Sequence, residues 1–138
     1  MQSTDKMGMT VLIVEDDASM LAILASRIAD EGYTVLKAQD GQQGLTRAMN
    51  EHPDLILLDL LLPKLSGLEL LNALRADERG KQIPAIILTN LNENDAIYKS
   101  VALRSTAYFI KSDSSLDHIA AEVRAKLGPA RGGPATEA

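Results

Sequence analysis

The sequence predicts a doubly wound α/β domain in which five parallel strands form one sheet flanked by five helices. Short runs of Val, Ile and Leu alternate with amphipathic helical segments along the chain. The runs are apolar on both faces and end at polar residues, as expected of parallel strands that helices cover on both sides. A length of 138 residues suits a single domain of this class.

The first strand and helix establish the pattern for the rest of the chain. An apolar run at 11–14 predicts a strand that stops at Glu15. Apolar residues at helical spacing then predict a helix over 18–31 with one buried face. Asp17 can cap the first turn of this helix, and Gly32 ends it.

The same unit recurs toward the C-terminus. Asp40 is the expected cap of the second helix, and Ser66 with Glu69 predicts a capping box at the start of the third. The first, third and fourth strands are the most apolar, so we expect them at the centre of the sheet. Further strands are expected over 34–36, 55–58, 85–88 and 108–110, and further helices over 41–50, from Gly67 through Leu74, around Ile97 to Val101 and over 116–127.

The segments outside these elements are polar. We expect residues 1–9 to be a flexible leader, residues 10–127 to form the folded domain, and residues 128–138 to be a disordered tail. Because only this tail follows the last helix, we expect the domain to act alone, without an output domain of its own.

The composition argues against several classes of function. Hydrophobic residues make up 46% of the chain, and the formal net charge is −5, with no basic cluster. An acidic domain of this kind is a poor candidate for binding nucleic acid or an anionic membrane surface. The chain has no cysteine, no apolar run that could span a bilayer and no signal peptide, and together these predict a cytoplasmic protein.

The residues at the strand ends predict a functional site. Because the carboxyl ends of parallel strands share one edge of a sheet, side chains that are far apart in sequence meet there. The residues that end the first, third, fourth and fifth strands are Glu15 with Asp16, Asp59, Thr89 and Lys111.

This set of side chains suits phosphoryl transfer. Three neighbouring carboxylates repel one another, and a hard divalent cation such as Mg²⁺ would relieve that repulsion. With a cation held by Glu15 and Asp16, Asp59 could attack phosphorus as a nucleophile. The Lys111 ammonium and the Thr89 hydroxyl would then complement the negative charge of the transferred group.

These motifs, in this order and spacing, resemble the response-regulator receiver family of two-component signalling. The resemblance covers residues 10–127 and implies a flavodoxin-like fold with strand order 2-1-3-4-5. The residues that carry it are the run at 11–17, the run from Pro53 to Asp59, Pro63, Gly67, the run at 87–89 and the run at 108–111.

The resemblance also implies roles for individual residues. Asp59 would accept a phosphoryl group from a histidine kinase or a phosphotransfer protein, so the domain would be a phosphoacceptor and not an enzyme acting on other substrates. Glu15, Asp16 and Asp59 would hold Mg²⁺, with the main-chain carbonyl of Leu61 as a further ligand.

The resemblance further implies a conformational switch that follows phosphorylation. Thr89 would move toward the phosphoryl group and Tyr108 would turn inward behind it. The face formed by the fourth helix, the fifth strand and the fifth helix would then change its protein partners.

The sequence departs from the family pattern in several places. Ser112 follows Lys111 where a cis proline is usual, and we expect a trans peptide there because a non-proline cis bond costs about 3 kcal/mol. Asn90 and Arg104 replace a small residue and a glycine. Two apolar residues flank the acidic site, and we hypothesise that they shield the acyl phosphate from water; they are Leu61 and Leu91.

Two other functions remain open at this point. The departures at Asn90, Arg104 and Ser112 would suit a pseudo-receiver, an unphosphorylated domain that acts as a constitutive interaction module. A small enzyme on the same fold is disfavoured. A phosphatase would need a second aspartate at Leu61, and a nucleotide binder would need a glycine-rich loop where the first strand is followed by acidic residues.

Overall fold

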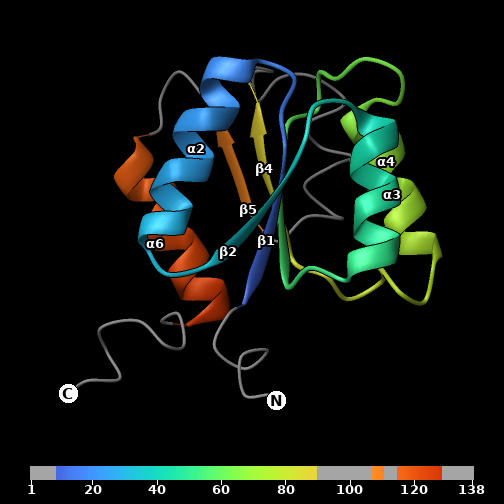
Figure 1. Cartoon of the computed structure of the whole chain (residues 1–138). Coiled ribbons are helices and arrows are strands. Elements are labelled where there is room, and N and C mark those ends of the chain that lie inside the picture. Colours follow the sequence, from blue (N-terminus) through green and yellow to red (C-terminus); the bar gives the residue numbers. More distant parts are fainter. Residues whose placement is uncertain (1–8, 90–106, 111–114, 129–138) are drawn as a thin grey trace.

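The computed structural model describes residues 9–89, 107–110 and 115–128. Its sheet has five parallel strands in the order β2-β1-β3-β4-β5, which confirms the expected order (Figure 1). The three strands expected at the centre, β1, β3 and β4, are the inner strands, and β2 and β5 form the edges. The strands are β1 (Thr10–Val14), β2 (Thr34–Ala38), β3 (Leu55–Leu58), β4 (Ala85–Thr89) and β5 (Ala107–Ile110).

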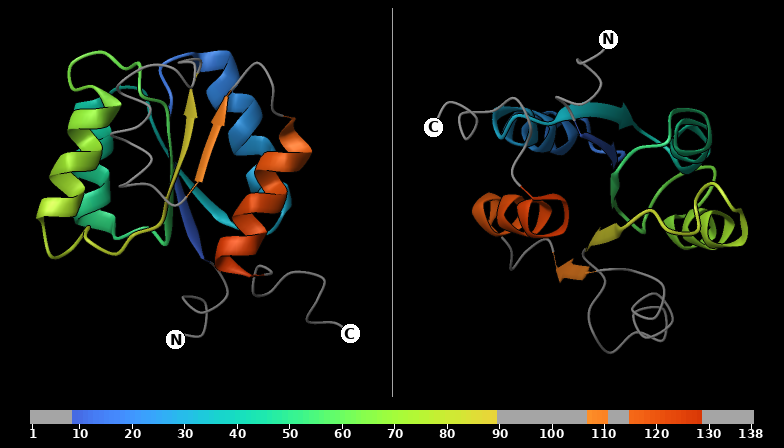
Figure 2. Two further views of the ribbon diagram at one scale, coloured as in Figure 1. Left: turned by 180° about the vertical axis from the view of Figure 1, so that it is seen from behind. Right: turned by 90° about the horizontal axis from the view of Figure 1, so that it is seen from below.

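Helices cover both faces of the sheet. The described helices are α2 (Ala18–Asp30), α3 (Gly41–Glu51), α4 (Gly67–Ala76) and α6 (Leu116–Leu127). Figure 2 shows α2 and α6 together on one face and α3 with α4 on the other. The helix expected around Ile97 to Val101 lies outside the described residues, as do most of the expected leader and tail. Within the described part of the chain, no helix has both the length and the apolar character needed to cross a bilayer.

The helices start where the sequence predicts because side chains satisfy their first backbone donors. Asp17 accepts a hydrogen bond from the Met20 N–H at 3.0 Å, and Asp40 accepts one from the Gln43 N–H at 2.7 Å. At α4 both bonds of the expected capping box are present: the Glu69 N–H donates to the Ser66 hydroxyl, and the Ser66 N–H donates to the Glu69 carboxylate.

The inner strands divide the core into two layers. Alternate side chains of β1 and β3 point to opposite faces, so Val11 and Ile13 pack beneath α2 and α6 while Leu12 and Val14 pack beneath α3 and α4. Each side chain of this size contributes about 1.5–3 kcal/mol when it is fully buried. The continuous apolar runs are therefore explained by burial of both faces of the sheet.

A cluster of charged residues joins α2 to α6 at the amino edge of the sheet. We call Arg27, Glu31, Asp117 and Arg124 the Glu31 cluster. Arg27 pairs with Glu31 at 3.3 Å and with Asp117 at 2.8 Å, and Arg124 also donates to the Glu31 carboxylate. Burial opposes ionisation of Glu31, but the hydrogen bonds from the two guanidinium groups outweigh it, so its pKa lies below the ordinary value of 4.5.

Candidate functional site

Three carboxylates meet at the carboxyl edge of the sheet, and we call Glu15, Asp16 and Asp59 the acidic cluster. Strands β1 and β3 are neighbours with Val14 opposite Leu58, so the residues that follow them are adjacent. One oxygen from each carboxylate lies within 4.8 Å of the others. Glu15 is 2% exposed and Asp59 is 5% exposed, whereas Asp16 is open to solvent.

Backbone hydrogen bonds fix where the two buried carboxylates lie. The Glu15 N–H donates to the Ala38 carbonyl at 3.0 Å, and the Asp59 N–H donates to the Val14 carbonyl at 3.1 Å, so each residue continues the sheet ladder by one position. The carboxylates in turn accept from the loops that follow the strands. Asp17 N–H donates to Glu15 Oε2 at 3.1 Å, and Leu61 N–H donates to Asp59 Oδ1 at 3.1 Å.

The acidic cluster fits a hard divalent cation. All of its ligand atoms are oxygens. Two of the three carboxylates are buried, and like charges repel more strongly in the protein interior than in water. Mg²⁺ is bound in proteins by a small number of carboxylates while it keeps several waters, and the exposed Asp16 leaves the cluster open to water on one side. The donor chemistry and the burial therefore both suit this ion.

The loop after β3 is held by close backbone contacts at two glycines. The Gly67 N–H donates to the Leu60 carbonyl at 2.9 Å, and a Cβ at Gly67 would lie 2.3 Å from the carbonyl oxygen of Asp59. The Gly41 N–H donates to the Pro63 carbonyl at 3.3 Å, and a Cβ there would overlap the main chain of Leu65. The role of Gly41 was not predicted, because nothing in the sequence pairs it with a loop more than twenty residues later.

The other predicted site residues are described in part or not at all. Thr89 ends β4 and is paired with Ile110 of β5, which places its backbone at the same edge as the acidic cluster. Tyr108 lies in β5 opposite Ile87. The side chains of Thr89 and Tyr108 lie outside the described part, and so do the whole residues Asn90, Leu91, Arg104, Lys111 and Ser112.

The fold and the acidic cluster define a flavodoxin-like α/β domain with three carboxylates gathered at one edge. The family model for the response regulator receiver domain matches residues 11–124. The chain belongs to this family, the receiver domains of two-component signalling, which confirms the resemblance found in the sequence.

Curated relatives are transcriptional regulators. The phosphate regulon transcriptional regulatory protein PhoB of Pseudomonas aeruginosa is 36% identical over 113 residues, which are 82% of this chain and 49% of PhoB. The DNA-binding response regulator MtrA of Mycobacterium tuberculosis is 32% identical over 123 residues, which are 89% of this chain and 52% of MtrA. The chain thus spans about half the length of these relatives.

Solved structures of receiver domains superpose on nearly the whole chain. A CheY-like receiver domain protein from Methanospirillum hungatei has a TM-score of 0.77 at 28% identity, covering 87% of this chain and 94% of that one. The receiver domain of a sensor histidine kinase from Pseudomonas aeruginosa has a TM-score of 0.79 at 26% identity, covering 88% and 98%. That structure contains a magnesium ion coordinated in its active-site cleft.

Proposed function

We propose that this domain accepts a phosphoryl group on Asp59 from a histidine kinase or a phosphotransfer protein. The observation that carries the proposal is the acidic cluster, in which oxygens of Glu15, Asp16 and Asp59 lie within 4.8 Å of one another at the carboxyl edge of a receiver fold. These three residues, with the main-chain carbonyl of Leu61, would hold Mg²⁺. When bound, this ion would offset the carboxylate repulsion and the charge of the incoming phosphoryl group.

The chemical step then falls to Asp59. One of its carboxylate oxygens attacks phosphorus, the bond from phosphorus to the donor nitrogen breaks, and an acyl phosphate forms. The Leu61 N–H, 3.1 Å from Asp59 Oδ1, orients the carboxylate for attack. Lys111 and Thr89, which follow and end neighbouring strands, complete the set of groups that meet the phosphoryl oxygens.

The output of the domain is a change in protein contacts. Thr89 and Tyr108 lie in adjacent strands, so a movement of Thr89 toward the phosphoryl group is coupled through the β4–β5 pair to Tyr108. The surface that changes is the one formed by the helix expected around Ile97 to Val101, β5 and α6. We propose that residues 10–127 carry out this function; the curated relatives are longer regulators.

Phosphorylation with a small donor tests this proposal. The purified protein is incubated with acetyl phosphate, with and without Mg²⁺, and its intact mass is measured. We expect a Mg²⁺-dependent phosphoryl adduct that Asp59→Asn abolishes and that the exposed control Asp30→Asn leaves unchanged. Amide NMR with beryllofluoride should show shifts that reach Thr89 and Tyr108.

Two results would contradict the proposal. An adduct that persists in Asp59→Asn would place the phosphoacceptor elsewhere. A protein that binds no Mg²⁺ and gains no adduct would be a pseudo-receiver, and its function would lie in constitutive contacts of the unmodified surface.

A further inference from the structure

The outer edge of β2 lies in a trough between two helices. Among the strands that the structure describes, β2 pairs with β1 alone, and the right-hand view in Figure 2 shows α2 and α3 on either side of it. Two hollows lie along this edge, with volumes of about 320 and 430 Å³. We call the open edge of β2 with these hollows the β2 trough.

The backbone of β2 offers hydrogen-bonding groups to this trough. The Thr34 N–H donates to the Met9 carbonyl and the Glu15 N–H donates to the Ala38 carbonyl, so the even-numbered residues of β2 bond to β1. In a parallel ladder the alternate residues face the other way, which directs the N–H and C=O groups of Val35 and Lys37 outward. No hydrogen bond to these groups is found within residues 9–89, 107–110 and 115–128.

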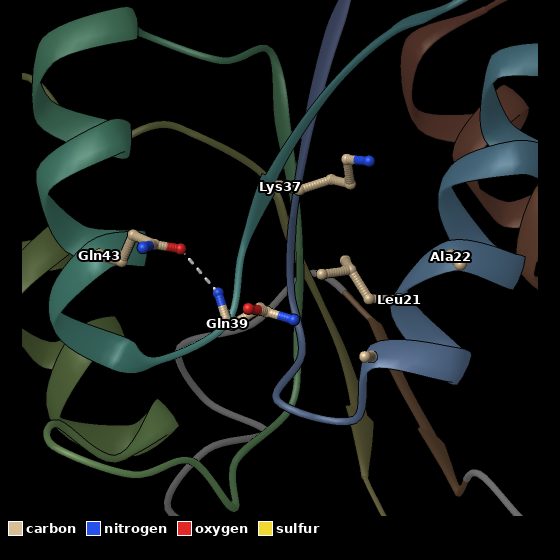
Figure 3. Close-up of a pocket in the computed structure, with 6 residues that line it drawn as sticks. Leu21, Ala22, Lys37, Gln39 and Gln43 are labelled. Atoms are coloured by element: carbon tan, nitrogen blue, oxygen red, sulfur yellow. Dashed lines mark hydrogen bonds between the residues drawn. The ribbon is translucent and has the colours of Figure 1, made fainter.

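A side chain closes the open edge at its C-terminal end. The Gln39 N–H, the next outward donor, is bonded to Gln43 Oε1 at 2.9 Å, as the dashed line in Figure 3 shows. A strand that adds to β2 therefore pairs with Val35 and Lys37 and ends at Gln39.

The α2 wall of the trough is made of small uncharged residues. The two hollows share Ala22 and Lys37, and the remaining lining from α2 is apolar or hydroxylic. The exposed positions of α2 along this wall carry short side chains, so an added strand can approach the helix closely. They are Ala18, Ala22, Ser26 and Ala29.

The charge of the trough is opposite to that of the chain. Among the described residues that line the two hollows, Lys37 is the one charged side chain, although the chain as a whole carries −5. Lys37 forms no ion pair with any residue that the structure describes, and Figure 3 shows its side chain directed toward α2.

We propose that the β2 trough binds an extended acidic segment of a partner protein, which adds to the sheet as a strand beside Val35 and Lys37. Backbone pairing supplies the register, small side chains of the segment face α2, and a carboxylate meets Lys37. The acidic cluster lies at the carboxyl ends of β1 and β3, away from the outer side of β2, and takes no part in this contact. The interaction is therefore independent of phosphorylation on Asp59.

A titration followed by amide NMR tests this proposal. The probe is a short capped peptide whose residues on one strand face are alanine and glutamate, with threonine at the positions between them, and the control peptide has lysine in place of glutamate. We expect the acidic peptide alone to shift the amide signals of Val35, Lys37 and Ala22 and to slow hydrogen exchange at Val35 and Lys37. Equal shifts with both peptides, or shifts confined to other surfaces, would overturn the proposal.

Charge reversal tests the part played by Lys37. Lys37→Glu should weaken binding of the acidic peptide by about tenfold or more, whereas the exposed control Lys81→Glu should not. Asp59→Asn should bind the peptide like the unmodified chain, so a failed phosphoacceptor proposal would leave this result unchanged.

An edge lysine can also serve only to prevent strands of identical chains from pairing. In that case the Lys37→Thr variant would self-associate in sedimentation experiments, and the unmodified chain would not bind the peptide. This outcome would refute the proposal.

Discussion

Carboxylates gather at both ends of the sheet, but the chain surrounds them differently. At the amino edge Glu31 lies between the guanidinium groups of Arg27 and Arg124, which come from α2 and α6. At the carboxyl edge Glu15 and Asp59 lie beside a third carboxylate, and the bonds to the loops that follow their strands come from backbone N–H groups. Both groups contain carboxylates that are largely withdrawn from solvent.

This difference distinguishes a charged group that stabilises the fold from one that suits a functional site. The Glu31 cluster contains its own cations, so its charges are balanced within the fold and it joins two helices. The acidic cluster brings three carboxylates together, and this arrangement suits a bound divalent cation. A carboxylate surrounded by guanidinium groups therefore stabilises the fold, whereas carboxylates that face one another reduce stability until a ligand binds.

The largest effect is expected from Gly67→Ala, beside the acidic cluster. The new Cβ would lie 2.3 Å from the Asp59 carbonyl oxygen and 2.5 Å from Leu60 Cα, so the backbone must move. We expect the free energy of unfolding to fall by about 3 kcal/mol in urea denaturation. Gly128→Ala at the amino edge meets no atom within 4 Å and should cost about 1 kcal/mol through its positive φ. Equal losses at the two glycines would contradict this account.

Neutralising Asp59 should stabilise the protein in the absence of Mg²⁺. Asp59→Asn keeps an oxygen that can accept from Leu61 N–H and removes one of the neighbouring like charges. We expect the free energy of unfolding to rise by about 2 kcal/mol. This is less than the roughly 4 kcal/mol by which two like unit charges about 4 Å apart repel each other at a protein surface. Added Mg²⁺ should raise the melting temperature of the unmodified chain and not that of the variant. A variant less stable than the parent without Mg²⁺ would disprove the repulsion.

A polar residue at Leu61 should shorten the life of the acyl phosphate. Leu61 is 55% exposed beside Asp59, where an apolar side chain can keep water from the phosphorus. In Leu61→Asn we expect hydrolysis to be about tenfold faster, equivalent to roughly 1.4 kcal/mol of barrier, with phosphate release as the measurement. Ile23→Asn, at an apolar position 49% exposed on α2, is the control and should leave the rate unchanged. An unaltered rate in Leu61→Asn would remove the shielding hypothesis.

Neutralising Glu31 should destabilise the protein, in contrast to neutralising Asp59, and its effect should be the smallest of the four. We expect Glu31→Gln to lower the free energy of unfolding by about 1 kcal/mol near neutral pH, because the Arg124 partner is partly exposed to solvent. The pKa of Glu31 is lowered by folding, so its contribution is complete above the unfolded value of 4.5 and is lost as the pH falls through the folded value. Denaturation of both proteins across this range should show the difference shrink in acid. A difference that is constant or that grows in acid would argue against the ion pairs as its cause.

Local chemistry explains why so much of the fold is predictable. The wholly apolar strand at 11–14 and the caps Asp17 and Ser66 act within a few residues, so the sequence reveals them directly. β2 was predicted to end at Leu36 and continues to Ala38. The last two residues of β2 were not predicted because Lys37 interrupts the apolar run. An edge strand tolerates such a charged residue, whereas an inner strand would exclude it.

The acidic cluster was predictable for a different reason. Residues that end parallel strands meet at one edge, so Glu15 and Asp59 could be placed together once the strands were recognised. Their burial, the bond from Leu61 N–H to Asp59 and the support that Gly41 gives to the loop after β3 could not be predicted, because each depends on packing between distant segments.

The sequence by itself determined the succession of strands and helices along the chain, the capped helix starts and the residues that end each strand. These features depend on local propensity and periodicity. Tertiary structure alone decided that the Glu31 carboxylate lies between two guanidinium groups. Glu31 is 93 residues from Arg124, and only the packing of α6 against α2 brings them together. Charge that is ordinary along the chain becomes a structural clamp at one edge and a candidate binding site at the other, because folding sets the distance between the groups.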